Sequence, residues 1–99
     1  MEEIAVKMQF TEIVDQDEAR KVLDEALRHE AELAAARHAY FERACLAFEQ
    51  QYNLSSDEFL QQFESGALGD AEVYFDWYAV KHGLDLWERR LYILSGVKV

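Results

Sequence analysis

Residues 4–10 alternate between large apolar side chains and small or polar ones. A period of two is typical of a half-buried β-strand, because successive side chains point to opposite faces. The rest of the chain has helical patterns, so the backbone of such a strand would pair with a second chain or with solvent. The alternative is an amphipathic extension of the following helix. The apolar face, predicted to contact a second copy or another partner, consists of Ile4, Val6, Met8 and Phe10.

Residues 17–52 contain no glycine or proline and are rich in alanine and glutamate. Their apolar positions recur at intervals of three and four, which predicts one long amphipathic helix. Asn53 is its predicted end, because asparagine tolerates the left-handed conformation that closes many helices. Positions seven apart indicate packing along a seam against an antiparallel neighbour, and they are Leu27, Ala34, Phe41 and Phe48.

A short helix is predicted over residues 55–65. Ser55 is its expected N-cap, because Glu58 three residues later completes a capping-box pattern. Gly66 is expected to end it. Its apolar residues should cover the junction of the two long helices, and they are Phe59, Leu60 and Phe63.

A third helix is predicted over residues 70–95, with Asp70 as its N-cap and Gly96 after its last turn. Gly83 interrupts the pattern, and its missing side chain would permit a bend or a close helix crossing. Trp77 and Trp87 fall on the same seam and are predicted to lie in the core. The seam positions are spaced four and three apart in turn: Val73, Trp77, Val80, Leu84, Trp87, Leu91 and Leu94.

These elements predict one mainly α domain over residues 1–99. Its expected architecture is a long antiparallel helical hairpin with a short capped helix between the two long helices, plus an N-terminal β-strand-like segment over residues 1–14. A helix of residues 17–52 would be about 54 Å long and its partner about 37 Å, at 1.5 Å per residue. The first helix should therefore break near Ala34–Ala36, or its N-terminal third should project beyond the hairpin.

Charge narrows the class of partner. The formal net charge is -10 at pH 7. Direct nucleic-acid binding is disfavoured, because that binding depends on Lys and Arg displacing counterions from phosphates. A ribbon-helix-helix-like DNA binder would share the order of strand and helix, but its first helix would be shorter and its charge positive. The same negative field would accelerate encounter with a basic protein.

Cellular context follows from cysteine use and hydropathy. One cysteine, Cys45, has no internal disulfide partner, which fits a reducing compartment. No apolar run is long enough to cross a bilayer, and the first residues lack the basic start of a signal peptide. We therefore expect a cytoplasmic protein without membrane contact.

Residues 53–76 combine six carboxylates with several aromatic residues and contain no Lys or Arg. Such a surface suits a basic protein partner, with carboxylates meeting its charges and aromatic side chains acting as anchors. The bland alternative is a solvated helix face, which is what charge runs usually form. The predicted partner-binding residues are Asp57, Glu58, Phe63, Glu64, Asp70, Glu72, Tyr74, Asp76 and Tyr78.

Catalytic and metal sites are not predicted. Glu25, His29 and Glu32 share one helical face, but the paired Glu-x-x-His motifs of di-iron bundles are missing, and His38 with Glu42 offers only two ligands. Cys45 has the surroundings of a small buried thiol. His82 has no sequence partner that would make it a pH switch. The expectation is a protein with no cofactor and no enzymatic activity.

A central motif carries a resemblance to a known family. It consists of Tyr52-Asn53-Leu54-Ser55-Ser56-Asp57-Glu58-Phe59, then Phe63, Gly66, Leu68-Gly69-Asp70 and Phe75-Asp76-Trp77. This run resembles small acidic helical proteins of bacteria and archaea that look like antitoxins of two-gene toxin-antitoxin modules. Asn53 and Leu54 stand where that pattern has Gly and Met. The resemblance implies a neutraliser of a small, nuclease-like toxin.

The sequence therefore predicts a non-catalytic protein-binding protein, of the antitoxin type, that covers the active surface of a basic partner. The alternative is a homo-oligomeric structural or adaptor protein, in which the N-terminal strands of two copies pair across a two-fold axis.

Overall fold

The computed structural model describes residues 3–7 and 14–98. Helix α1 (Gln16–Tyr52) begins where the Asp15 carboxylate accepts hydrogen bonds from the backbone N–H groups of Asp17, at 2.9 Å, and Glu18, at 3.4 Å. It ends at Asn53, whose φ of 49° and ψ of 49° are left-handed as predicted. The helix is continuous, so the predicted alternative of a break near Ala34–Ala36 is wrong.

Helix α2 (Ser56–Glu64) has the predicted cap. The hydroxyl of Ser55 accepts a hydrogen bond from the backbone N–H of Glu58 at 3.1 Å. The chain then leaves the helix at Ser65 and turns at Gly66, which has a φ of +82°. A left-handed backbone costs glycine little, so Gly66 separates α2 from the following turn.

Helix α3 (Glu72–Ser95) starts later than expected. Its N-cap is Ala71, and among the described residues no side chain caps its first turn, so the prediction of Asp70 as N-cap is wrong. Gly69, with a φ of +82°, reverses the chain before the helix. At the other end the backbone N–H of Gly96 donates to the carbonyl oxygen of Ile93 at 3.1 Å.

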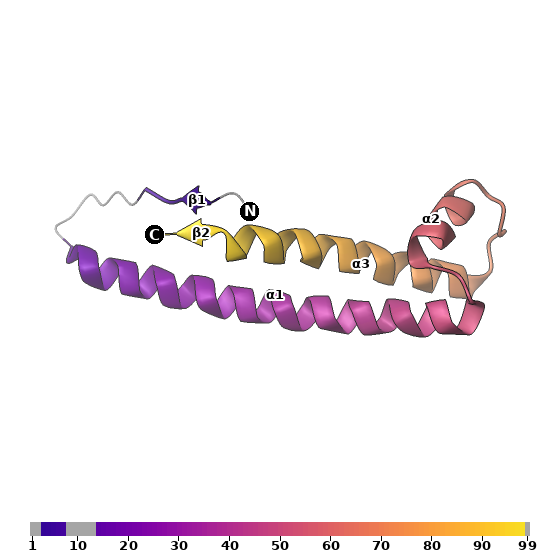
Figure 1. Cartoon of the computed structure of the whole chain (residues 1–99), viewed down its shortest axis with the longest axis horizontal. Helices are drawn as coiled ribbons and strands as arrows, with labels where there is room; N and C mark the ends of the chain where they lie inside the picture. Colours follow the sequence, from indigo (N-terminus) through magenta and orange to yellow (C-terminus); the bar gives the residue numbers. More distant parts are fainter. Residues whose placement is uncertain (1–2, 8–13, 99) are drawn as a thin grey trace.

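Helices α1 and α3 form a long antiparallel hairpin, and α2 lies across its closed end (Figure 1). The molecule measures 60 × 24 × 22 Å. The predicted seam is correct, because all seven of its positions on α3 are buried or partly buried. Gly83 is a close helix crossing, since a Cβ added there would lie 2.6 Å from the ring of Phe41. Among the described helices, none is long and apolar enough to span a membrane.

The N-terminal segment folds back on its own chain. Strand β1 (Ile4–Ala5) pairs in parallel with strand β2 (Val97–Lys98), with Ile4 opposite Val97. Val6 and Lys7 follow without ladder pairing, so the strand predicted over residues 4–10 is not shown. The expectation that it would have no partner in its own chain is wrong at Ile4 and Ala5. The start of α1 extends beyond the end of α3 (Figure 1).

Buried hydrophobic side chains are sparse along this elongated hairpin. Those among the described residues are Ala19, Ala34, Cys45, Phe59 and Trp77. Trp77 confirms its predicted core position, but Trp87 is only partly buried. The guanidinium carbons of Arg37 and Arg90 lie 4.5 and 4.8 Å from the centroid of the Trp87 ring. Two arginines therefore cover this indole where the prediction placed apolar neighbours.

Candidate protein-binding surface

Trp77 fixes α2 to the hairpin. Its indole N–H donates a hydrogen bond of 2.9 Å to the hydroxyl of Ser56. The ring of Phe59 stacks on the same indole with centroids 3.9 Å apart and planes 6° apart. Both aromatic side chains are fully buried. The first and fourth residues of α2 are thus held by a single side chain of α3.

Helix α1 contributes a second attachment. The backbone N–H of Ser56 donates to the Glu49 carboxylate at 3.0 Å. Phe48 and Tyr52 stack on Trp77 at centroid distances of 5.5 and 5.6 Å. Among the described residues, every buried side-chain nitrogen and oxygen has a hydrogen-bond partner. Unsatisfied polar groups are costly in a core, so these satisfied hydrogen bonds favour a single arrangement of α2 on the two long helices.

Lys81 ties α2 to α3 through charge. Its Nζ lies 3.0 Å from an oxygen of Asp57 and 2.9 Å from an oxygen of Asp85. Burial opposes the charged form of this lysine, but the hydrogen bonds and charges of Asp85 and Asp57 outweigh burial and raise the pKa of Lys81. The ammonium therefore stays charged. Asp57, a predicted partner-binding residue, forms this ion pair while its side chain stays exposed to solvent.

Cys45 lies beneath this network. The side chain is 2% exposed, as the sequence predicts for a small buried thiol. Burial raises the pKa of Cys45, and a hydrogen bond with Ser56 and the charge of Lys81 offset only part of that effect. The thiol is therefore protonated at neutral pH, whereas a cysteine nucleophile needs the thiolate.

We define the acidic head as residues 56–76, which comprise α2, the turn after it and the start of α3. All six of its predicted partner-binding carboxylates are exposed, and Asp57 is one of them. Five of the six take part in no described ion pair: Glu58, Glu64, Asp70, Glu72 and Asp76. The sequence places no Lys or Arg within the head. Lys81 pairs with Asp57 and Asp85 and forms no described ion pair with these five carboxylates.

The aromatic residues of the head are less accessible than predicted. Tyr74 packs against Tyr52 and Phe59, at centroid distances of 6.0 and 6.1 Å. Tyr78 packs against Phe63 at 5.4 Å and against the His82 ring at 4.3 Å. Both tyrosines are partly buried, so the prediction that they are exposed anchors is wrong. The reason is α2, which folds over the face of α3 that carries them.

Phe75 is the accessible aromatic side chain that the predicted site omitted. It is 52% exposed and touches the edge of the Phe63 ring, with centroids 5.1 Å apart. Phe63 itself is partly buried by Phe59. The signal was present in the sequence, because Phe75 falls between the seam positions Val73 and Trp77 and so points away from the hairpin.

The predicted partner strand is described only in part. Ile4 belongs to the intramolecular ladder, and Val6 is 43% exposed. Met8 and Phe10 lie outside the described residues. The homo-oligomer alternative was based on a strand that has no partner in its own chain. The ladder between Ile4–Ala5 and Val97–Lys98 supplies such a partner for the first two residues of that segment.

The candidate metal ligands on α1 lie outside the acidic head. Glu25, His29 and Glu32 are exposed on α1. Within residues 3–7 and 14–98, no group of three His, Cys, Asp or Glu side chains is placed to hold a metal ion.

Comparisons with known protein families, with curated proteins and with solved structures found no match to this chain. The resemblance of residues 52–77 to an antitoxin family therefore stays a prediction.

Proposed function

We propose that this protein is a non-catalytic protein-binding protein whose acidic head docks on a basic protein partner. The observation that carries the proposal is the set of five exposed carboxylates, outside any described ion pair, on a head without Lys or Arg. The narrower form is an antitoxin-type neutraliser, in which these carboxylates take the place of nucleic-acid phosphates on a nuclease-like partner. A head held by Trp77 and Lys81 would present them with little ordering cost.

Long-range charge and short-range aromatic contact have different roles at this surface. The exposed carboxylates attract a basic partner over a distance, which raises the association rate and makes it sensitive to salt. Phe75 supplies the exposed apolar contact, and a desolvated aromatic anchor slows dissociation. Asp57 has a different part, because its pairing with Lys81 serves the fold.

Affinity capture from host lysate tests the proposal with matched baits. The test variant neutralises three carboxylates of the head that no described ion pair uses, through Glu58→Gln, Glu64→Gln and Asp70→Asn. The control variant makes the same change of net charge on exposed positions of α1, through Glu25→Gln, Glu32→Gln and Asp24→Asn.

We expect a basic protein to be retained by the parent and by the α1 control at low salt, and to be lost by the head variant. Retention of the same proteins by all three baits would contradict the proposal. Circular dichroism of the variants checks that each bait is folded.

A further inference from the structure

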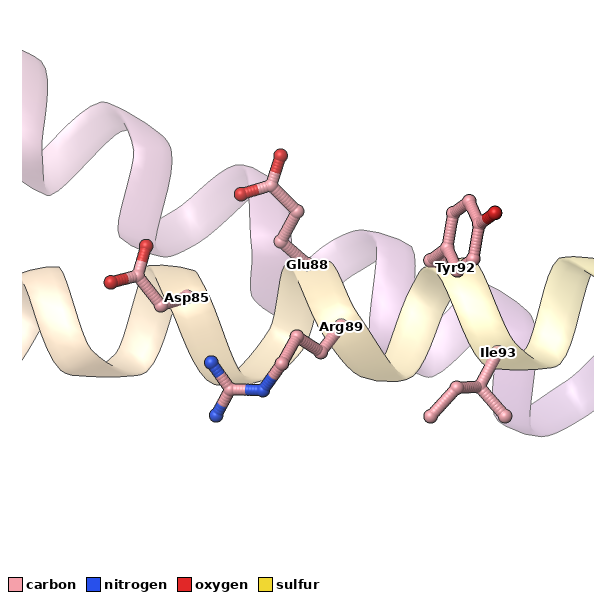
Figure 2. Close-up of a pocket in the computed structure, with 5 residues that line it drawn as sticks. All are labelled: Asp85, Glu88, Arg89, Tyr92 and Ile93. Atoms are coloured by element: carbon pink, nitrogen blue, oxygen red, sulfur yellow. The ribbon is translucent and has the colours of Figure 1, made fainter. Parts of the chain in front are cut away.

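The outward face of α3 carries a continuous stripe of solvent-exposed positions. Residues three and four apart on a helix share one face. Except for Leu86, which is partly buried, all members of the stripe are exposed. Figure 2 shows the C-terminal part of this region, with α1 passing behind α3. The stripe consists of Glu72, Phe75, Asp76, Ala79, His82, Leu86, Arg89, Arg90 and Ile93.

Charge changes sign along this stripe. Its N-terminal part holds the carboxylates of Glu72 and Asp76, and its C-terminal part holds the guanidinium groups of Arg89 and Arg90. The small side chain of Ala79 lies between them. A face that is acidic at one end and basic at the other is complementary to itself when a second copy runs in the opposite direction.

We propose that two copies of this chain pair through this stripe, with their α3 helices antiparallel and a two-fold axis passing between positions 82 and 83. That axis places Ala79 of one copy level with Leu86 of the other, and Asp76 within one residue of the level of Arg90. A two-fold axis brings the same flank of both helices together, and Asp76 shares its flank with Arg90, about 40° away around the helix, whereas Arg89 lies on the other flank. Arg90 covers Trp87 of its own chain and is exposed, so it is the cation that faces Asp76. The symmetry repeats each contact on the other side of the axis.

The same register gives Phe75 a site. It stands level with Arg90 of the second copy, at the centre of the four positions spaced three and four apart that form a hole for a knob. Those positions are Leu86, Arg89, Arg90 and Ile93. Phe75 is 52% exposed and Ile93 is 50% exposed, so pairing would remove both from water.

An open hollow of about 540 Å³ adjoins that hole. It is lined by Asp85, Glu88, Arg89, Tyr92 and Ile93, and Figure 2 shows these side chains along the outer surface of α3. Arg89 and Ile93 belong to both the hole and the hollow. The ring of Phe75 from a second copy therefore has apolar space beside its predicted position.

This pairing goes beyond the proposed function and shares Glu72, Phe75 and Asp76 with it, so a second copy and a basic partner would compete for this edge of the acidic head. The carboxylates of Glu58, Glu64 and Asp70 lie off the stripe. Its test needs only the purified chain. Failure of the pairing would leave binding of a basic partner open, and failure to bind such a partner would leave the pairing open.

Analytical ultracentrifugation of the purified full chain over a wide concentration range is the test. We expect a species of twice 11.6 kDa. Asp76→Arg and Arg90→Asp should each raise the dimer dissociation constant at least about tenfold, because each reversal puts like charges together twice in a two-fold dimer. The double variant Asp76→Arg with Arg90→Asp exchanges the signs and should recover most of the loss.

Matched controls are charge reversals at neighbouring exposed positions on α1, Glu42→Arg and Arg43→Glu, which should leave dimerisation unchanged. Phe75→Ala should weaken the dimer without a charge change. A monomer at every concentration would overturn the proposal. So would a dimer that tolerates both single reversals on α3, or a double variant no stronger than the single ones. Helical circular dichroism confirms that each variant is folded.

Discussion

The ring of Phe59 lies parallel to the indole of Trp77, with centroids 3.9 Å apart, and both side chains are fully buried. One residue belongs to α2 and the other to α3. The hydrogen bond from the same indole to Ser56 fixes the start of α2 as well. This pair of rings is therefore a central contact between the acidic head and the hairpin.

Phe59→Ala should lower the free energy of unfolding by about 3–5 kcal/mol, as large-to-small changes of buried aromatic residues do. That is a large share of the stability of a small domain. Urea unfolding followed by circular dichroism measures it. Tyr92→Ala is the control, because Tyr92 is 55% exposed and its replacement should change stability by only about 0.5 kcal/mol. Equal midpoints for Phe59→Ala and the parent would refute the structural role of the pair.

The two tryptophans should differ in their contribution to stability. Trp77→Ala should fall in the range of about 3–5 kcal/mol, whereas Trp87→Ala should cost clearly less, because Trp87 is only partly buried and is covered by Arg37 and Arg90. Denaturant unfolding of both variants under the same conditions provides the comparison. A larger loss for Trp87→Ala would mean that the arginine-covered indole is a core residue after all.

Gly83→Ala should destabilise the hairpin even though alanine favours a helix by about 1 kcal/mol. A Cβ at this position would meet the Phe41 ring at 2.6 Å, and overpacking typically costs about 1–3 kcal/mol. Thermal unfolding should show a lower midpoint. The double variant Phe41→Leu with Gly83→Ala should lose less than the two single losses combined, because the smaller side chain relieves the clash. A stabilising Gly83→Ala would show that the crossing is loose.

Stability should fall at alkaline pH. Burial lowers the pKa of Lys81, but hydrogen bonds and charges from Asp85 and Asp57 together outweigh it, so the pKa lies above its ordinary value of 10.5. A group with a raised folded pKa binds more protons in the folded state, so its stabilisation is complete below pH 10.5 and is lost as the pH rises through the folded pKa.

Cys45 adds an earlier onset in the same direction. Burial raises the pKa of its thiol above the ordinary value of 9.0, so the unfolded chain loses this proton first and stability declines above pH 9.0. Cys45→Ala should remove the fall in the free energy of unfolding that this thiol causes between pH 9.0 and 10.5. The fall caused by Lys81 at higher pH should remain. Urea unfolding on both sides of pH 9.0 checks this, and an identical pH profile for the variant would rule out the thiol as a cause.

Local chemistry explains which parts of the fold were predictable. The Ser55 cap and the left-handed Asn53 depend on neighbours within a few residues, so their patterns are visible in the chain. The seam of α3 follows from regular spacing, and the close crossing at Gly83 follows from a missing side chain on that helix. At Asp70 the same logic failed, because the N-cap is one residue later, at Ala71, and the helix begins at Glu72.

The contacts that shape the candidate site join residues far apart in sequence. Asp57 pairs with Lys81 while its side chain stays exposed, and Tyr74 is covered because α2 folds against α3. Neither effect has a spacing that reveals it. The pairing of Ile4 with Val97 joins opposite ends of the chain, which local patterns of hydrophobicity do not encode. Exposure of Phe75 was within reach, because it follows from the seam alone.

The association rate with the captured basic partner tests the central proposal most directly, because long-range charge acts on encounter. Surface plasmon resonance at low and high salt should show slower association and a flatter salt dependence for the head variant with Glu58→Gln, Glu64→Gln and Asp70→Asn. The α1 control variant should keep most of the parent's rate. An association rate and salt dependence unchanged in the head variant would contradict the account and leave the acidic head a solvated surface.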